Sequence, residues 1–174
     1  RYNPIAEYFE KLTDWDGEDH IRKLAGFVRT NDSEAFRYHL EKWLTRAVLC
    51  ALKKDYVNKQ CLVLASSRQN TGKTTFLRFL IPDGLRGYYS ENVTVDKDGI
   101  IAICKNFILN ADELAVLSKS DVNTLKSFIS MGGAKVRVPY GRKPENMDRI
   151  CSFVASTNRT DFLTDETGSV RWLV

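Results

Sequence analysis

Apolar residues change their spacing along the chain near residue 59. Before that point they recur every three or four positions, which is the pattern of amphipathic helices that bury one face. The longest such stripe follows Asn31–Glu34, whose side chains are suited to capping a helix, and it comprises Phe36, Leu40, Trp43, Leu44, Ala47, Val48 and Ala51. We therefore predict a helical region over residues 1–58.

Over residues 59–174 the pattern changes to short apolar runs separated by helical or turn segments. Buried strands are predicted at residues 62–65, 107–109 and 152–155, and an amphipathic helix is predicted at residues 118–131. Strands that alternate with helices favour a parallel sheet with helices on its faces. The predicted fold class is α/β: an αβα sandwich with a mostly parallel sheet, preceded by the helical region.

The strongest chemical signal is the stretch CLVLASSRQNTGKTTFLRFL at residues 61–80. A strand, a polar loop and a helix that opens at Gly72-Lys73-Thr74 stand in the order of a phosphate-binding P-loop, with Ser67 where the pattern has glycine. Backbone N–H groups and the helix dipole favour a phosphate there. Lys73 brings a positive charge to the β- and γ-phosphates of ATP, and Thr74 brings a hydroxyl to Mg²⁺.

The predicted ATP contacts are consecutive along this loop and the first helical turn. They are Ser67, Arg68, Gln69, Asn70, Thr71, Gly72, Lys73, Thr74 and Thr75. A chance Gly-Lys-Thr at an ordinary loop–helix junction is the alternative, and the strand before it and the helix after it disfavour that interpretation. The predicted sandwich is therefore that of a P-loop NTPase.

Two acids follow the strand predicted at residues 107–109. Ligands bind at the carboxyl ends of strands in open α/β sheets, so Asp112 is placed to hold the hydration shell of Mg²⁺, and Glu113 to orient or deprotonate the attacking water. Two solvated acids at the start of a helix are the alternative. A separation of about forty residues from the P-loop, common for a Walker B strand, favours the metal site.

Polar residues also follow the strand predicted at residues 152–155. The amide of Asn158 at that strand end can hold the water or contact the γ-phosphate, although a turn asparagine is an equal alternative at this point.

Residues 135–144 alternate basic and apolar side chains before a Tyr-Gly turn, which predicts a β-hairpin. Single-stranded DNA could be contacted there by Arg137, Tyr140, Arg142 and Lys143. An exposed hairpin with solubilising charges is the alternative.

The composition changes this picture little. The chain has 174 residues, a net charge of +4 and 43% hydrophobic residues, which is ordinary for a soluble globular protein. No apolar stretch approaches the ~20 residues of a membrane span, so we expect a cytoplasmic protein with no membrane partner. The four cysteines are isolated in apolar contexts, which favours buried thiols over zinc ligands or disulfides. Because the sequence begins at Arg1, we expect a fragment of a longer protein.

The order of these motifs resembles the superfamily three helicases of viruses and plasmids, which are AAA+-like motors. The chain is more closely similar to the virulence-associated protein E family of phage and mobile-element primase–helicases. The resemblance covers essentially the whole chain, and its motifs are Trp15-Asp16-Gly17, Asn70–Thr74, Asp112-Glu113-Leu114, Arg137–Arg142, Thr157–Thr160, Phe162–Asp165 and Gly168–Arg171.

The resemblance implies the ATP-hydrolysing motor domain of a replicative helicase or primase–helicase. Lys73 and Thr74 would bind phosphates and Mg²⁺, Asp112 the metal and Glu113 the water. It further implies that Asn158 senses the γ-phosphate and that Arg171 is an arginine finger acting across a subunit boundary in a homo-oligomeric ring, with a hexamer as one option. The hairpin would line the pore and grip single-stranded DNA. A small-molecule kinase and a non-hydrolysing assembly module are the competing functions.

Overall fold

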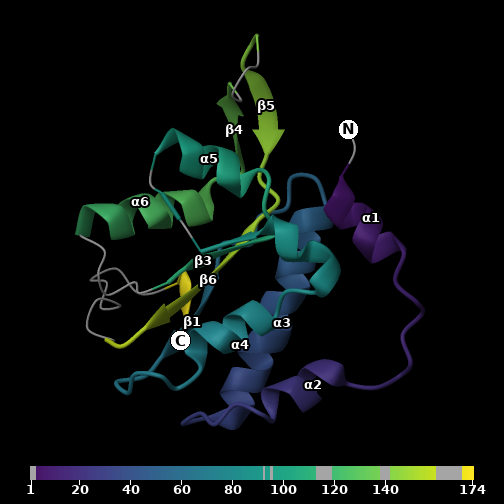
Figure 1. The fold of residues 1–174 in the computed structure, drawn as a ribbon, viewed down its shortest axis with the longest axis vertical. Coiled ribbons are helices and arrows are strands. Elements are labelled where there is room, and N and C mark those ends of the chain that lie inside the picture. The colour runs from purple at the N-terminus through teal and green to yellow at the C-terminus, as the bar shows by residue number, and fades with distance from the viewer. Residues whose placement is uncertain (1–2, 92, 95, 113–118, 138–141, 160–169) are drawn as a thin grey trace.

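The computed structural model describes residues 3–91, 93–94, 96–112, 119–137, 142–159 and 170–174 (Figure 1). The elements, in chain order, are α1 Pro4–Glu10, α2 His20–Ala25, α3 Ser33–Leu52, β1 Cys61–Ala65, α4 Lys73–Phe79, the 3₁₀ helix η1 Asp83–Tyr88, β2 Tyr89–Ser90, α5 Lys97–Ile103, β3 Ile108–Ala111, α6 Lys119–Ser130, β4 Gly133–Val136, β5 Glu145–Asp148, β6 Ser152–Thr157 and β7 Trp172–Leu173.

The main sheet has the strand order β2-β3-β6-β1-β7, and each neighbouring pair is parallel. Strand β6 lies between β1 and β3, and its Ala155 pairs with Val63 on one side and with Ala111 on the other. The predicted parallel α/β sheet is confirmed. Strands β4 and β5 form a separate antiparallel pair, which confirms the predicted hairpin, although its residues 138–141 lie outside the described part of the chain.

Successive residues of the central strands point into two different cores, as the period of a strand requires. Val63, Leu109 and Phe153 pack with side chains of α5, α6 and the hairpin. Leu62 and Val154, one position along, pack with α1, α3, α4 and η1 on the other face. Helices therefore cover both faces of the sheet, which is the predicted αβα sandwich (Figure 1).

The helices before residue 58 form one layer of this sandwich. Asn3 caps α1 by accepting hydrogen bonds from Ile5 and Ala6, and its amide donates to the carbonyl of Ala51 in α3. Asp32 caps α3, as the sequence predicts. These helices share a core with the sheet. The division of the chain at residue 58 into two domains stays a prediction.

The guanidinium of Arg149 lies inside the molecule, between the hairpin and β6. The residue is 2% exposed, and its charge is satisfied by backbone carbonyls. Nε donates to Cys151 O at 2.8 Å and Nη2 to Asn58 O at 2.8 Å, and Cζ lies 5.0 Å from the ring centre of Phe153. The remaining acceptors are carbonyls at the end of α6, those of Phe128, Ile129 and Met131. One side chain thus joins α6, β6, the base of the hairpin and the segment after α3.

A polar network ties β2 and β3 to α4. The carboxylate of Glu91 accepts from Nε and Nη2 of Arg78 at 2.6 and 2.7 Å. The hydroxyl of Tyr89 donates to Glu91 at 2.8 Å and accepts from the amide of Asn110 at 3.1 Å. The hydrogen bond from Arg78 lowers the pKa of Glu91, and the hydrogen bond from Tyr89 lowers it to a smaller extent. Burial raises the pKa of Tyr89.

We expect Arg149→Met to lower the free energy of unfolding by about 3 kcal/mol or more, because it leaves several buried carbonyls without a donor. Arg149→Lys should recover part of the loss, since an ammonium cannot reproduce the planar fork. Urea unfolding measures both. Arg142→Met, an exposed arginine, is the control and should change stability by about 0.5 kcal/mol at most. Equal losses of unfolding free energy in Arg149→Met and Arg142→Met would contradict this role of Arg149.

The Arg78–Glu91 pair predicts a pH-dependent contribution to stability. Because the pKa of Glu91 is lowered from its ordinary value of 4.5, its contribution is complete above that value and is lost as the pH falls through the lower, folded-state pKa. The melting temperature of wild type should therefore exceed that of Glu91→Gln above about pH 5, and the gap should close in more acid buffer. Glu10→Gln leaves the pair intact and should follow the wild-type curve. A gap that is constant with pH would exclude the ion pair as its cause.

Candidate functional site

Most of the predicted site residues come together where three neighbouring strands end. The carboxyl ends of parallel strands meet at one edge of a sheet, and this is where ligands bind in such folds. The polar loop of residues 66–72 follows β1, Asp112 follows β3, and Asn158 follows β6, which lies between them. The sheet order thus places the predicted P-loop, metal and sensor residues around one point.

The loop after β1, which is the predicted P-loop, contains two residues with left-handed backbone conformation. Asn70 and Gly72 have φ values of 55° and 83°, in the left-handed region that asparagine tolerates and glycine favours. Gly72 precedes α4, whose first N–H groups receive no side-chain cap. Ser66 N donates to Thr157 O at 3.1 Å, which joins the loop to β6. Ser67 is not among the described residues with positive φ, so its backbone does not require the glycine that the motif usually has.

The ammonium of Lys73 is directed back over this loop. It donates to Asn158 Oδ1 at 2.8 Å, to Arg68 O at 3.1 Å and to Thr71 Oγ1 at 3.4 Å. Because an asparagine side chain also has two donors, Oδ1 can accept from Lys73 while Nδ2 remains for a ligand. The structure therefore places Lys73 and Asn158 in contact, although 85 positions separate them in the sequence.

Three oxygen-bearing side chains, those of Thr74, Asp112 and Ser156, contact one another at the same sheet edge. Thr74 Oγ1 lies 3.2 and 3.3 Å from the two carboxylate oxygens of Asp112. Ser156, which is buried at the end of β6, donates its hydroxyl to the same carboxylate. Hydroxyl and carboxylate oxygens are the donors that Mg²⁺ takes in phosphate-binding sites, so these residues fit the predicted metal.

Sequence reasoning assigned no role to Ser156. Its signal was the polar run Ser156-Thr157-Asn158 after the apolar residues 153–155, in which Ser156 and Asn158 are two positions apart. Residues at that spacing lie on one side of a strand, so both side chains face the same site.

Two predicted catalytic residues are not placed at this site. Glu113 lies outside the described residues, so its role stays a prediction. Arg171 immediately precedes β7 and lies at the opposite end of the sheet, where its carbonyl accepts from Cys61 N at 2.8 Å. Strand β1 alone puts about 13 Å between that end and the P-loop. Arg171 therefore does not reach the site of its own chain.

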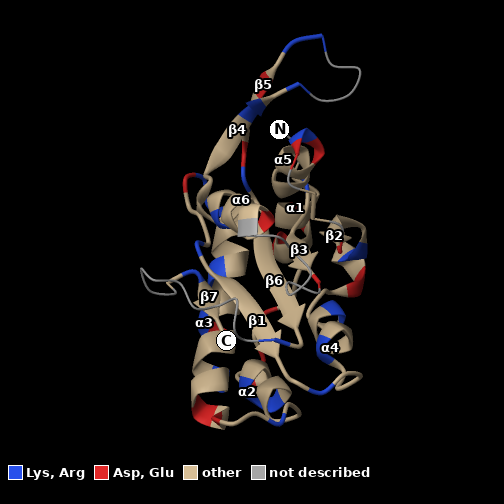
Figure 2. Cartoon of the chain, turned by 90° about the vertical axis from the view of Figure 1, so that its left-hand side faces the viewer, with Lys and Arg blue, Asp and Glu red and all other residues tan. Residues whose placement is uncertain are grey.

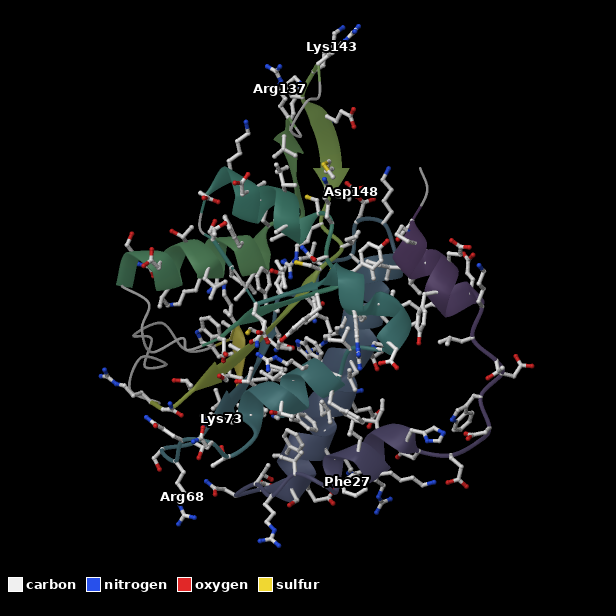
Figure 3. All side chains as sticks on the ribbon, in the orientation of Figure 1. Phe27, Arg68, Lys73, Arg137, Lys143 and Asp148 are labelled. Carbon is white, nitrogen blue, oxygen red and sulfur yellow. The ribbon has the colours of Figure 1, made fainter. Side chains whose placement is uncertain are left out.

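The hairpin carries its basic residues away from the P-loop. Arg137, Arg142 and Lys143 are exposed, and Arg137 and Lys143 lie toward the far end of the hairpin, opposite Lys73 and Arg68 (Figure 3). Lysine and arginine positions occur on both arms of this projection (Figure 2). Tyr140 lies outside the described residues, and DNA contact by this group of residues stays a prediction.

The cysteines take no part in the site. All four are buried and free, and burial raises the pKa of Cys151 to about 12, so this thiol stays protonated at neutral pH. Within the described ranges, no helix combines the length and the apolar character that crossing a bilayer demands.

Comparison with solved structures identifies the same fold elsewhere. The chain is similar to the apo structure of the NrS-1 C-terminal region, residues 305–718, with a TM-score of 0.62 and 18% identity over 93% of this chain and 39% of that one. It is also similar to the A-form apo structure of that region, with a TM-score of 0.63 and 18% identity over 93% of this chain and 38% of that one. The chain thus spans less than two fifths of these neighbours, and identity at this level shows the fold alone.

No curated protein matches the chain. The family model of the virulence-associated protein E-like domain matches residues 9–174, which is nearly the whole sequence and includes every part of the site. With its parallel sheet and with Asp112 beside Thr74, the chain belongs to the virulence-associated protein E-like domain family.

Proposed function

We propose that the chain is a magnesium-dependent ATPase, the motor domain of a replicative helicase or primase–helicase from a phage or mobile genetic element. The observation that carries the proposal is the pairing of two contacts at one sheet edge. Lys73 lies 2.8 Å from Asn158, and Thr74 lies 3.2 Å from Asp112. Hydrolysis of a nucleoside triphosphate needs a positive charge that binds phosphate, oxygen ligands for a metal ion and a polar group that contacts the terminal phosphate. Lys73 supplies the first, Thr74 and Asp112 the second, and Asn158 the third.

Each residue has a distinct task in this proposal. The backbone of residues 67–72 and the ammonium of Lys73 bind the phosphates. Thr74 and Asp112 would hold Mg²⁺, and the ion would supply positive charge to offset the negative charge of the phosphates. Ser156 fixes the Asp112 carboxylate by donating a hydrogen bond to it. Asn158 presents Nδ2 to the terminal phosphate or the water, and Glu113 orients that water and accepts its proton.

The position of Arg171 supports a motor built from several copies. Its place at the opposite end of the sheet from Lys73 suits an arginine that serves the site of a neighbouring copy in a ring. An arginine supplied in this way stabilises transition-state charge. The projecting basic hairpin suits the grip on single-stranded DNA, whose phosphates attract cations.

Lys73→Ala should abolish ATP binding, whereas Glu113→Gln should retain binding and lower turnover by about a hundredfold or more. Nucleotide affinity by calorimetry and phosphate release measure the two effects separately. Lys54→Ala, an exposed lysine after α3, is the control and should match wild type in both. Equal loss of affinity in the Lys73 and Glu113 variants would contradict the role of Glu113, and phosphate transfer to a small molecule would indicate a kinase.

Replacing Arg137, Arg142 and Lys143 together with glutamine should weaken binding of single-stranded DNA. If each residue contacts one phosphate, the slope of log affinity against log salt should fall in magnitude by about 2. Fluorescence anisotropy at several salt concentrations measures this slope. A control with Arg29, Lys53 and Lys54 changed to glutamine loses the same charge elsewhere on the surface. Similar slopes in the two variants would show that the hairpin only adds to overall charge.

A further inference from the structure

A surface cavity of about 530 Å³, widely open to solvent, lies beside the last turns of α6, at the start of β7. Its described lining residues are one amide, two hydroxyls, one thioether and two cations: Asn123, Ser127, Ser130, Met131, Lys126 and Arg171. Most of these side chains can donate hydrogen bonds, and none of them is acidic. A lining of this composition suits an anionic group.

Ser130 fixes the direction of Arg171. Arg171 Nε donates to Ser130 Oγ at 3.1 Å, and Ser130 Oγ donates to the carbonyl of Lys126 at 3.1 Å. A hydroxyl has one proton, so donation to the helix carbonyl turns a lone pair toward Arg171. The guanidinium is held at Nε. Among the residues that the structure describes, Nη1 and Nη2 have no hydrogen-bond partner, so both can donate to a ligand in the cavity.

The charge under the cavity is also favourable. A helix C-terminus ordinarily repels anions, because its last carbonyls carry partial negative charge. In this protein, Arg149 donates to the carbonyls of Phe128, Ile129 and Met131 from inside the fold. The buried guanidinium therefore offsets the negative end of α6 where Ser130 and Arg171 lie.

We propose that Ser130 is a positioning residue, which holds the Arg171 guanidinium with its terminal amino groups set for a phosphate in this cavity. The identity of that phosphate rests on the proposed function: it is the terminal phosphate of a nucleotide bound to a second copy of the chain. Arg171 cannot serve its own Lys73 site, because the two lie at opposite ends of the sheet. Ser130 thus acts on the reaction through Arg171 and does not contact the nucleotide itself.

Side-chain NMR tests the positioning without any need for activity. Arg171 Nε–H, assigned with Arg171→Lys, should be ordered in the wild-type chain and become mobile in Ser130→Ala. Thr124→Ala is the matched control, because Thr124 makes the same hydroxyl-to-carbonyl bond within α6, to Ser120 O at 3.0 Å, and does not line the cavity. Ser130→Thr keeps the hydroxyl and should restore order. Equal order of Arg171 in wild type and Ser130→Ala would overturn the proposal.

Steady-state kinetics test whether the Ser130–Arg171 hydrogen bond contributes to ATP hydrolysis. Ser130→Ala should lower the kcat for ATP about ten- to hundredfold, as misplacement of a transition-state group does, and leave nucleotide affinity unchanged. Thr124→Ala and Ser130→Thr should keep the wild-type kcat. Adding the Lys73→Ala chain, which has an intact cavity, should restore turnover to Ser130→Ala.

The two experiments separate the two proposals. A chain without any ATPase activity whose Arg171 loses order in Ser130→Ala would refute the proposed function and retain the positioning role. An active wild type with an unchanged kcat in Ser130→Ala would retain the ATPase and refute the role of Ser130 in it.

Discussion

The guanidinium of Arg149 is buried among backbone carbonyls, and its position decides how four parts of the chain meet. A charge in the interior is tolerated only where every donor finds an acceptor, so the carbonyls around it must keep their places. They belong to the end of α6, to Asn58 and to the residue before β6. The hairpin, the sheet and the helical layer are consequently held in one arrangement by a single hydrogen-bonding group.

The site depends on a second constraint, which is the order of the strands. Lys73 and Asp112 come from elements next to β1 and β3, which are not neighbours in the sheet. The strand between them contributes Ser156 to Asp112 and Asn158 to Lys73. The two polar residues at the end of β6 therefore contact both halves of the site between them, because β6 lies between β1 and β3.

Local signals predicted much of this from the sequence. The strand–loop–helix pattern around Gly72 and the acid after β3 are both encoded within a few residues, and the structure brings Thr74 and Asp112 together as predicted. The hairpin was likewise predicted from its alternation, and the antiparallel pairing of β4 and β5 confirms it, whereas the predicted Tyr-Gly turn lies outside the described residues. Other contacts between segments that are far apart in the sequence could not be predicted. Nothing near Arg149 distinguishes it from a surface arginine, because its acceptors come from segments up to 91 positions away.

The same limit applies to the ends of the sheet. The pairing of the two-residue strand β7 with the start of β1 places Arg171 far from Lys73. A strand of two residues is too short to show an alternation of apolar and polar positions in the sequence. The Arg78–Glu91 pair was missed for a related reason, since neither residue belongs to a motif. The roles of Glu113 and Tyr140 remain predictions from the sequence, because neither residue lies in the described part of the chain.

The three hydrogen bonds of Lys73 carry one more consequence. The ammonium has three protons, and its contacts with Asn158, Arg68 and Thr71 engage all of them. A phosphate that claims this lysine must displace at least one of these acceptors, so its net affinity is the difference between the new contact and the old one. If Asn158 is the group displaced, its amide becomes free to turn. Phosphate bound to the loop would then change the side-chain conformation of Asn158 at the end of β6, because the phosphate and Asn158 compete for the Lys73 ammonium. No movement of the sheet is required.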